Sequence, residues 1–350
     1  MFWKKKKISK KSHIKEWIKA VIIAVLIAIF IRTFIIQSFT VTSVQMENSL
    51  YAGDYIFVNK LKFGARFPVT ILSLPFTNNI YADWIQIPYW RLPAFGSLKH
   101  GDIIVFNYPV ESDPPIDKRV RYIKRLIGLP GDTLKIDDKI LYINNKSYDT
   151  LYNLKYKYRI VTDGTHFTDS ILNRYHITDG GIVADMGIFD FFISPNIADS
   201  ILNLPFVNNV RILKEFPSEN TWSYFPQNNY YNWNKDYYGP LIIPQKEKTV
   251  QINTRNIALY KRIIEVYENN KLFIDGDKII INGIETNSYT FKNNYYFVVD
   301  DNRDNAKDSR FWGFLPENHI IGIASFIWFS IDNSDERSSV RWKRIFSGIN

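Results

Sequence analysis

The 350-residue chain contains no cysteine. This absence excludes disulfide bonds, thiolate-bound metal sites and a cysteine nucleophile. Charged residues make up 23% of the sequence and hydrophobic residues 46%, which is the balance of a folded protein. Much of the net charge of +9 comes from lysines near the N-terminus, so it does not indicate a basic folded domain. We therefore expect no nucleic-acid partner.

Long apolar runs are scarce, and one stretch near the N-terminus stands out. Ala20–Ile31 is apolar and follows a lysine-rich block, and a short second apolar run comes after Arg32 and Thr33. No small-x-small cleavage site follows it, which favours an uncleaved signal anchor over a removed signal peptide. We predict a basic cytoplasmic segment at 1–19 and a transmembrane segment at 20–37. The rest would be periplasmic or otherwise extracytoplasmic, on a single-pass protein of the inner (cytoplasmic) membrane.

The remaining sequence favours β-structure. Aromatic residues reach 16%, and short apolar runs alternate with Gly, Pro and Asn turns. Residues 133–146 and 271–283 each have the pattern of a hairpin, and Ile323–Ile331 that of a buried strand. These patterns predict an all-β, antiparallel domain at 38–146 and 271–350. Residues 147–270 form a mixed insertion whose apolar spacing predicts one helix near 253–269.

A lysine lies inside an apolar strand pattern at Val120–Asp132. Alternation places Lys124 on the same face as Tyr122 and Leu126. Burial would lower the pKa of Lys124 and make it a neutral general base. The alternatives are that its ammonium reaches the surface or pairs with a carboxylate. The opposite face carries arginines, which can lie on a solvated or phosphate-facing surface: Arg119, Arg121 and Arg125.

A dense polar loop follows the predicted strand at Tyr295–Asp300. Its charged and amide residues are Asp301, Asn302, Arg303, Asp304, Asp308 and Arg310. Asp/Arg pairs could fix the loop geometry. A divalent-metal loop competes with this interpretation, but the interleaved arginines argue against a metal. A solvated loop without a role is the third alternative.

Four segments together resemble the type I signal peptidase family. They are Met46–Asp54, Gly101–Val105, Tyr122–Asp132 and Asp301–Gly313. The long Tyr/Asn-rich insertion and Phe106–Pro109 are similar to the Bacteroidetes branch.

The resemblance implies a membrane-anchored β-rich domain with a partly open barrel. It implies a serine endopeptidase that removes signal peptides from exported preproteins by a Ser/Lys dyad, without cofactor or metal. It assigns Lys124 as general base and Ser43 to the oxyanion hole, beside Met46 and the polar loop.

Three positions depart from the family pattern near the reaction centre. Gln45 stands where the nucleophilic serine is expected, and an amide is a very poor nucleophile. Ala306 replaces a serine that would hydrogen-bond the lysine, and Asp300 replaces a glycine.

These departures leave three hypotheses. The chain could be an inactive paralogue that binds preproteins or an active peptidase partner. It could be a working peptidase that uses Ser43 or Ser49. It could also be a decaying gene product or carry a sequence error, although the clustering of the changes speaks against random damage.

Overall fold

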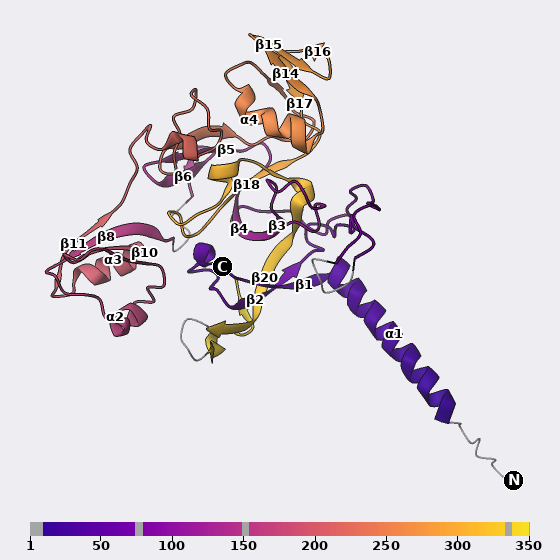
Figure 1. Cartoon of the computed structure of the whole chain (residues 1–350), viewed down its shortest axis with the longest axis horizontal. Helices are drawn as coiled ribbons and strands as arrows, with labels where there is room; N and C mark the ends of the chain where they lie inside the picture. Colours follow the sequence, from indigo (N-terminus) through magenta and orange to yellow (C-terminus); the bar gives the residue numbers. More distant parts are fainter. Residues whose placement is uncertain (1–9, 74–79, 149–153, 333–337, 350) are drawn as a thin grey trace.

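The computed structural model describes residues 10–73, 80–148, 154–332 and 338–349. A long helix, α1 (Lys10–Phe34), projects from a β-rich body (Figure 1). Within the described residues it is the one helix long and apolar enough to cross a membrane, over Ile14–Phe34. It begins before the predicted segment at 20–37 because lysines sustain a helix as well as apolar residues do. It ends earlier, since strand β1 (Ile36–Thr40) already contains Gln37.

The main sheet confirms the antiparallel all-β prediction. Its strands follow the order β1, β2, β20, β3, β4, β18, β19, and every neighbouring pair is antiparallel. Across the described residues the ends of this path, β1 and β19, do not pair with each other. The strands are β2 (Asp54–Asn59), β3 (Ile103–Asn107), β4 (Arg121–Gly128), β18 (Tyr295–Val299), β19 (Leu315–Pro316) and β20 (Ile320–Asp332), with β21 (Ser339–Val340) and β22 (Ser347–Gly348) paired to β20.

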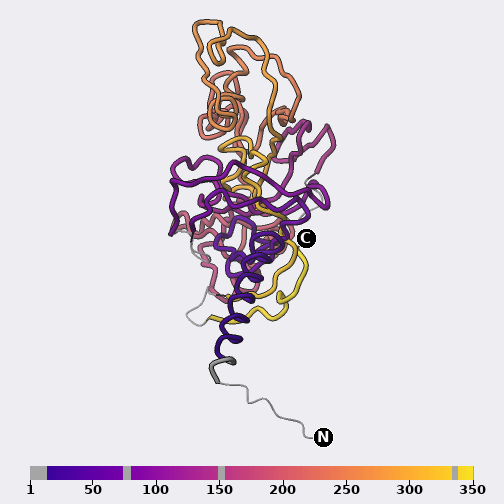
Figure 2. Tube along the Cα trace, turned by 90° about the vertical axis from the view of Figure 1, so that its right-hand side faces the viewer, coloured from indigo at the N-terminus to yellow at the C-terminus, as the bar shows by residue number. Residues whose placement is uncertain are grey.

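Both predicted hairpins are present. The first lies in a sheet of β5 (Thr133–Asp137), β6 (Ile140–Ile143), β7 (Lys146–Ser147) and β12 (Tyr238–Ile242). The second is β14 (Leu272–Asp275), β15 (Lys278–Ile281) and β16 (Ile284–Glu285). Figure 2 shows this orange region at the opposite end of the molecule from α1.

The range 147–270 divides into two structural parts. The first is a separate sheet with two helices: β8 (Tyr156–Thr162), β9 (Gly180–Ala184), β10 (Ile188–Ile193), β11 (Val207–Ile212), α2 (Asp169–Arg174) and α3 (Pro195–Leu202). The second pairs with strands outside the range, because β12 joins β5 and β13 (Thr249–Gln251) joins β17 (Ser288–Thr290). The helix predicted near 253–269 appears as α4 (Ile257–Arg262) continued by a π-helical turn, η4 (Ile263–Tyr267).

The described residues also contain four shorter helical turns, beside the four-residue helix α5 (Ser309–Trp312). They are η1 (Val44–Met46), η3 (Thr221–Ser223), η5 (Glu317–His319) and η6 (Trp342–Arg344).

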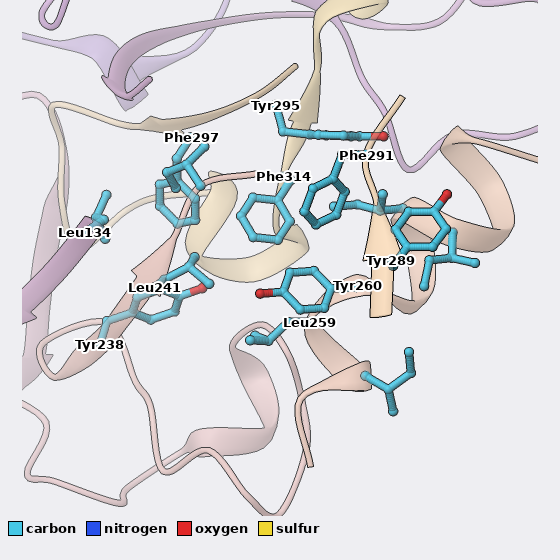
Figure 3. Packing of buried hydrophobic residues seen from close by; sticks show 14 of the residues in the cluster. Leu134, Tyr238, Leu241, Leu259, Tyr260, Tyr289, Phe291, Tyr295, Phe297 and Phe314 are labelled. Atoms are coloured by element: carbon cyan, nitrogen blue, oxygen red, sulfur yellow. The ribbon is translucent and has the colours of Figure 1, made fainter. Parts of the chain in front are cut away.

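An aromatic core joins the β5/β12 sheet to α4 and β18. Tyr238, Tyr260, Phe297 and Phe314 converge there (Figure 3). The other face of β18 packs into a second core through Val298. Because both faces of β18 are buried, its end is held firmly, and the polar loop begins at that point.

Candidate active site

Lys124 lies in the middle of β4, between β3 and β18, and is 1% exposed. Its Nζ donates a hydrogen bond of 2.7 Å to Gln45 Oε1 and one of 2.7 Å to Asp300 Oδ2. The distance from Nζ to Asp300 Oδ1 is 2.6 Å. The lysine therefore does not reach the surface. Of the sequence alternatives, pairing with a carboxylate is the arrangement observed.

Gln45 belongs to the turn η1, which is tied to the polar loop. Its backbone carbonyl accepts a 2.9 Å hydrogen bond from the amide of Asn302. Its side-chain oxygen faces Lys124, and the next residue, Met46, is buried in the core between β1, β2 and β20. The backbone therefore holds position 45 against the lysine, but the atom presented there is an amide oxygen with no proton to give up.

Asp300 directly follows β18 and is completely buried. Its Oδ2 also accepts a 3.0 Å hydrogen bond from the Lys307 amide. Burial raises the pKa of Asp300 to about 7, although the Lys124 ammonium acts in the opposite direction. Ala306 has no side-chain group that can bond Lys124, so the carboxylate of Asp300 is the acceptor that the loop supplies. Gln45, Lys124 and Asp300 thus form one connected cluster.

The polar loop is buried, so the expectation of a solvated loop is wrong. Asp301, Asn302, Asp308 and Arg310 are all inaccessible because opposite charges meet within the fold. Arg310 donates to Asp308 through Nε at 3.0 Å and through Nη2 at 2.8 Å. This geometry supports the Asp/Arg-pair interpretation. Among the described residues there is no group of three or more metal-ligating side chains.

The solvated position expected for Arg125 is also wrong. Its guanidinium is buried and donates two 2.7 Å hydrogen bonds to the carboxylate of Asp301. Arg125 Nη2 also donates to Ser49 Oγ at 2.7 Å, and Ser49 donates to Asp301 at 2.6 Å. Strand alternation missed this because the loop covers the second face of β4. Ser49 is therefore bound to this ion pair and does not contact Lys124.

Ser43 precedes η1 in an extended conformation and is exposed. The hydroxyl caps no backbone group of the turn. In the described part of the chain, Lys124 hydrogen-bonds Gln45 and Asp300 and not Ser43. The sequence thus brings Ser43 to the same turn as Gln45 but not into contact with the candidate base.

Two lysines that the sequence analysis did not single out contact the site, and the first of them lies in the insertion. Lys155 Nζ lies 2.6 Å from Glu47 Oε2, and both residues are buried. The Lys155 amide donates to the Asp301 carbonyl at 3.0 Å, and the Arg303 amide donates to the Lys155 carbonyl at 2.9 Å. The first part of the insertion therefore packs directly against the polar loop.

Lys139 plays a similar part from the β5/β6 turn. Its Nζ lies 2.8 Å from Asp236 and 2.9 Å from Asp304. Burial acts to raise the pKa of Asp304, but Lys139 and Lys235 hold it below the usual value. No local pattern marks these lysines in so lysine-rich a sequence, because their partners lie far away along the chain.

A cleft with a volume of about 740 Å³ lies beside η1. Thr40, Val41, Thr42 and Val44 line one side of it. The other walls come from the insertion, through His176 and Thr178, and from the C-terminal segment, through Arg341 and Arg344. Its volume lies in the range of ligand-binding clefts, and strand β1, which leads into it, forms one end of the main sheet.

Comparisons with known proteins agree on one family. The family model described as "Signal peptidase, peptidase S26" matches residues 14–186 and 242–329. A signal peptidase I of Buchnera aphidicola (subspecies Baizongia pistaciae) is 27% identical over 85% of this chain and 71% of its own length. A signal peptidase I of Helicobacter pylori strain 26695 is 24% identical over 90% of this chain and 86% of its own length.

A solved structure of a signal peptidase I from Enterococcus faecalis is 18% identical. It covers 66% of this chain and 100% of its own, with a TM-score of 0.24. That score is too low to carry an argument.

Proposed function

The chain belongs to the signal peptidase family S26, and we propose that its function is of the signal peptidase I type. In this proposal, the signal peptides of exported preproteins bind in the cleft beside η1. The observation that carries it is the placement of Lys124. A buried lysine faces position 45 across the cluster, at the point where η1, β4 and the polar loop meet. The matched family model spans all three of these segments.

We propose a single-pass anchor in the inner (cytoplasmic) membrane, with the N-terminus in the cytoplasm and the β-rich domain on the extracytoplasmic side. The apolar length of α1 and the lysines that precede its apolar part support this orientation. The lipid bilayer is then a partner of the chain, and preproteins would reach the cleft from the same membrane.

Cleavage and binding make different demands on the site. Cleavage by a Ser/Lys dyad needs a hydroxyl beside a neutral amine. Position 45 offers an amide, Ser49 is held by Arg125, and Lys124 is paired with Asp300. This cluster is the specific observation that favours a second candidate function, namely binding of preproteins without cleavage. An active signal peptidase paralogue would then make the cut.

The test is cleavage of an exported preprotein by the purified full-length chain in proteoliposomes. Lys124→Ala and Gln45→Ser are assayed in parallel, and retention of the uncut preprotein on the vesicles is measured. Cleavage that disappears in Lys124→Ala establishes a lysine-dependent peptidase and overturns the binding-only candidate. Retention without cleavage supports that candidate. If the chain neither retains nor cleaves the preprotein, the result contradicts a signal-peptidase-type function.

A further inference from the structure

An amine, an amide and a carboxyl group meet at Lys124. Its Nζ lies 2.7 Å from Gln45 Oε1 and 2.6 Å from Asp300 Oδ1. Because a C=O bond is about 1.2 Å long, Nζ lies within about 3.9 Å of the Gln45 Cδ carbon. Reacting atoms in a near-attack arrangement are about 3–3.5 Å apart, and a small rotation of the glutamine side chain covers the difference. The lysine can thus reach the amide carbon as well as the amide oxygen.

Apolar side chains on three strands enclose the amine and keep water away from it. Lys124 pairs with Ile104 of β3, and Leu126, on the same face of β4, pairs with Val298 of β18. All three apolar residues are completely buried. The turn η1 is held on the other side by its backbone hydrogen bond to the polar loop. Such fixed proximity replaces a collision between two molecules and lowers the barrier to a reaction between the two side chains.

Asp300 can move the protons that such a reaction requires. Its Oδ1 is buried and accepts no hydrogen bond from the residues that the structure describes. A proton on Nζ, 2.6 Å away, can therefore pass to this oxygen. Burial raises the pKa of Asp300 to about 7, because the carboxylate loses its solvation by water. Transfer of one proton within the pair leaves a neutral amine, which is a nucleophile, beside a carboxylic acid.

We propose that Lys124 Nζ attacks Gln45 Cδ and that the two side chains become joined by an isopeptide bond. The Nζ–Cδ bond forms and the Cδ–Nε2 bond breaks. Asp300 gives its proton to the departing Nε2 and takes one from Nζ, so ammonia leaves and Asp300 ends as a carboxylic acid. The reaction consumes no oxidant and no second substrate. Gln45 is only half-buried, which gives ammonia a path to solvent.

The bond would close the site to dyad chemistry. Lys124 would become an amide nitrogen, which is not basic, so the chain would bind preproteins without cleaving them. The bond would also fasten η1 to β4, and with it Val44 and Glu47, which line the cleft beside η1. The reaction occurs once in each chain, so a slow step is tolerated. It needs no preprotein, and its success or failure is therefore separate from that of the proposed function.

The test is the intact mass of the purified full-length chain in detergent, followed by peptide mapping with fragmentation. We expect a mass lower than that of the sequence by one ammonia, and a branched peptide that joins Gln45 to Lys124. Lys155 is the internal control, because its partner at 2.6 Å is the carboxylate of Glu47 and not an amide. The peptide that contains Lys155 should remain linear.

Two variants separate this reaction from others that change the mass. Gln45→Met removes the amide at a half-buried position and should abolish the loss of ammonia, with thermal unfolding to show that the variant is folded. Cyclisation at an Asn–Gly pair such as Asn282–Gly283 also releases ammonia, but it would persist in this variant. Asp300→Leu should form the bond about 10²–10⁴-fold more slowly, the usual contribution of a positioned acid–base group. Its rate is followed on newly synthesised chains sampled over time.

The natural chain at the full mass of its sequence, with linear peptides at positions 45 and 124, would overturn the proposal. A loss of ammonia that persists in Gln45→Met would do the same. A loss of water with Lys124 joined to Asp300 would also contradict it, because the carboxyl group would then be the group attacked. Equal rates for Asp300→Leu and the natural chain would show that Asp300 does not carry the protons.

Discussion

If the Lys124–Asp300 ion pair is what prevents dyad chemistry, restoring the serine alone should not restore cleavage. The variant Gln45→Ser places a hydroxyl on η1, but Lys124 keeps its carboxylate partner at 2.6–2.7 Å. To accept the serine proton, the lysine must first become a neutral amine and give up this buried attraction. We therefore predict that Asp300 must change together with Gln45.

The usual cost of breaking a buried ion pair gives the size of the effect. Breaking a buried ion pair costs about 3–5 kcal/mol, and each 1.36 kcal/mol on a barrier changes a rate about tenfold. Gln45→Ser alone should therefore cleave a preprotein roughly two to four powers of ten more slowly than a variant that also carries Asp300→Gly and Ala306→Ser. The double variant Gln45→Ser/Asp300→Asn should lie between them, because it removes the charge but leaves an amide against Lys124.

The assay is single-turnover cleavage of a labelled preprotein, with thermal unfolding of each variant to show that it is folded. Adding Lys124→Ala to the triple variant should abolish its cleavage, which ties the activity to this lysine. Equal rates for Gln45→Ser and the triple variant would refute the reasoning, since the carboxylate would then not oppose the base.

Three further predictions concern stability and the insertion. Lys155→Met should destabilise the chain by about 3–5 kcal/mol, because it leaves the buried Glu47 carboxylate without its charged partner. Chemical unfolding measures this, with the exposed Lys146→Met as the control that should change little. Asp300 has a raised pKa, so its contribution to stability is complete below about pH 4 and is lost as the pH rises through about 7. In thermal unfolding, Asp300→Asn should therefore gain stability relative to the unmodified chain as the pH rises from 4 to 8. A stability difference between the two proteins that stays constant over this range would contradict the raised pKa. Lys139→Met should remove one of the two lysines that hold the pKa of Asp304 down, so the stability that the ionised carboxylate provides above about pH 4 should shrink. An unfolding curve against pH that keeps its acid limb unchanged would count against this.

Local patterns predicted the fold well where the hydrophobic period was regular. The hairpins at β5/β6 and β14/β15 follow from short apolar runs that end in turn residues, and the central strand β20 follows from a strand-length apolar run. The pairing of β12 with β5 could not be predicted, since about a hundred residues separate the two strands and no local signal specifies the partner.

At the candidate site, the sequence identified Lys124 and the loop but not their environment. Alternation treated the Arg125 face of β4 as solvated, because it cannot show that a distant loop covers that face. Likewise, Asp300 stood out as a bulky departure, yet only the fold places its carboxylate on Lys124. The contacts from Lys155 and Lys139 come from long-range packing and leave no mark on the local sequence.

Photocrosslinking shows whether a signal peptide occupies the cleft beside η1. Thr42→Cys places a unique thiol on the wall of this cleft, and Phe273→Cys serves as the distant control. A photoreactive group on this thiol, in the full-length chain in proteoliposomes, should crosslink an exported preprotein through its signal peptide and should not crosslink the same protein without it. Equal crosslinking of both forms, or equal crosslinking from position 273, would show that the signal peptide does not bind in this cleft.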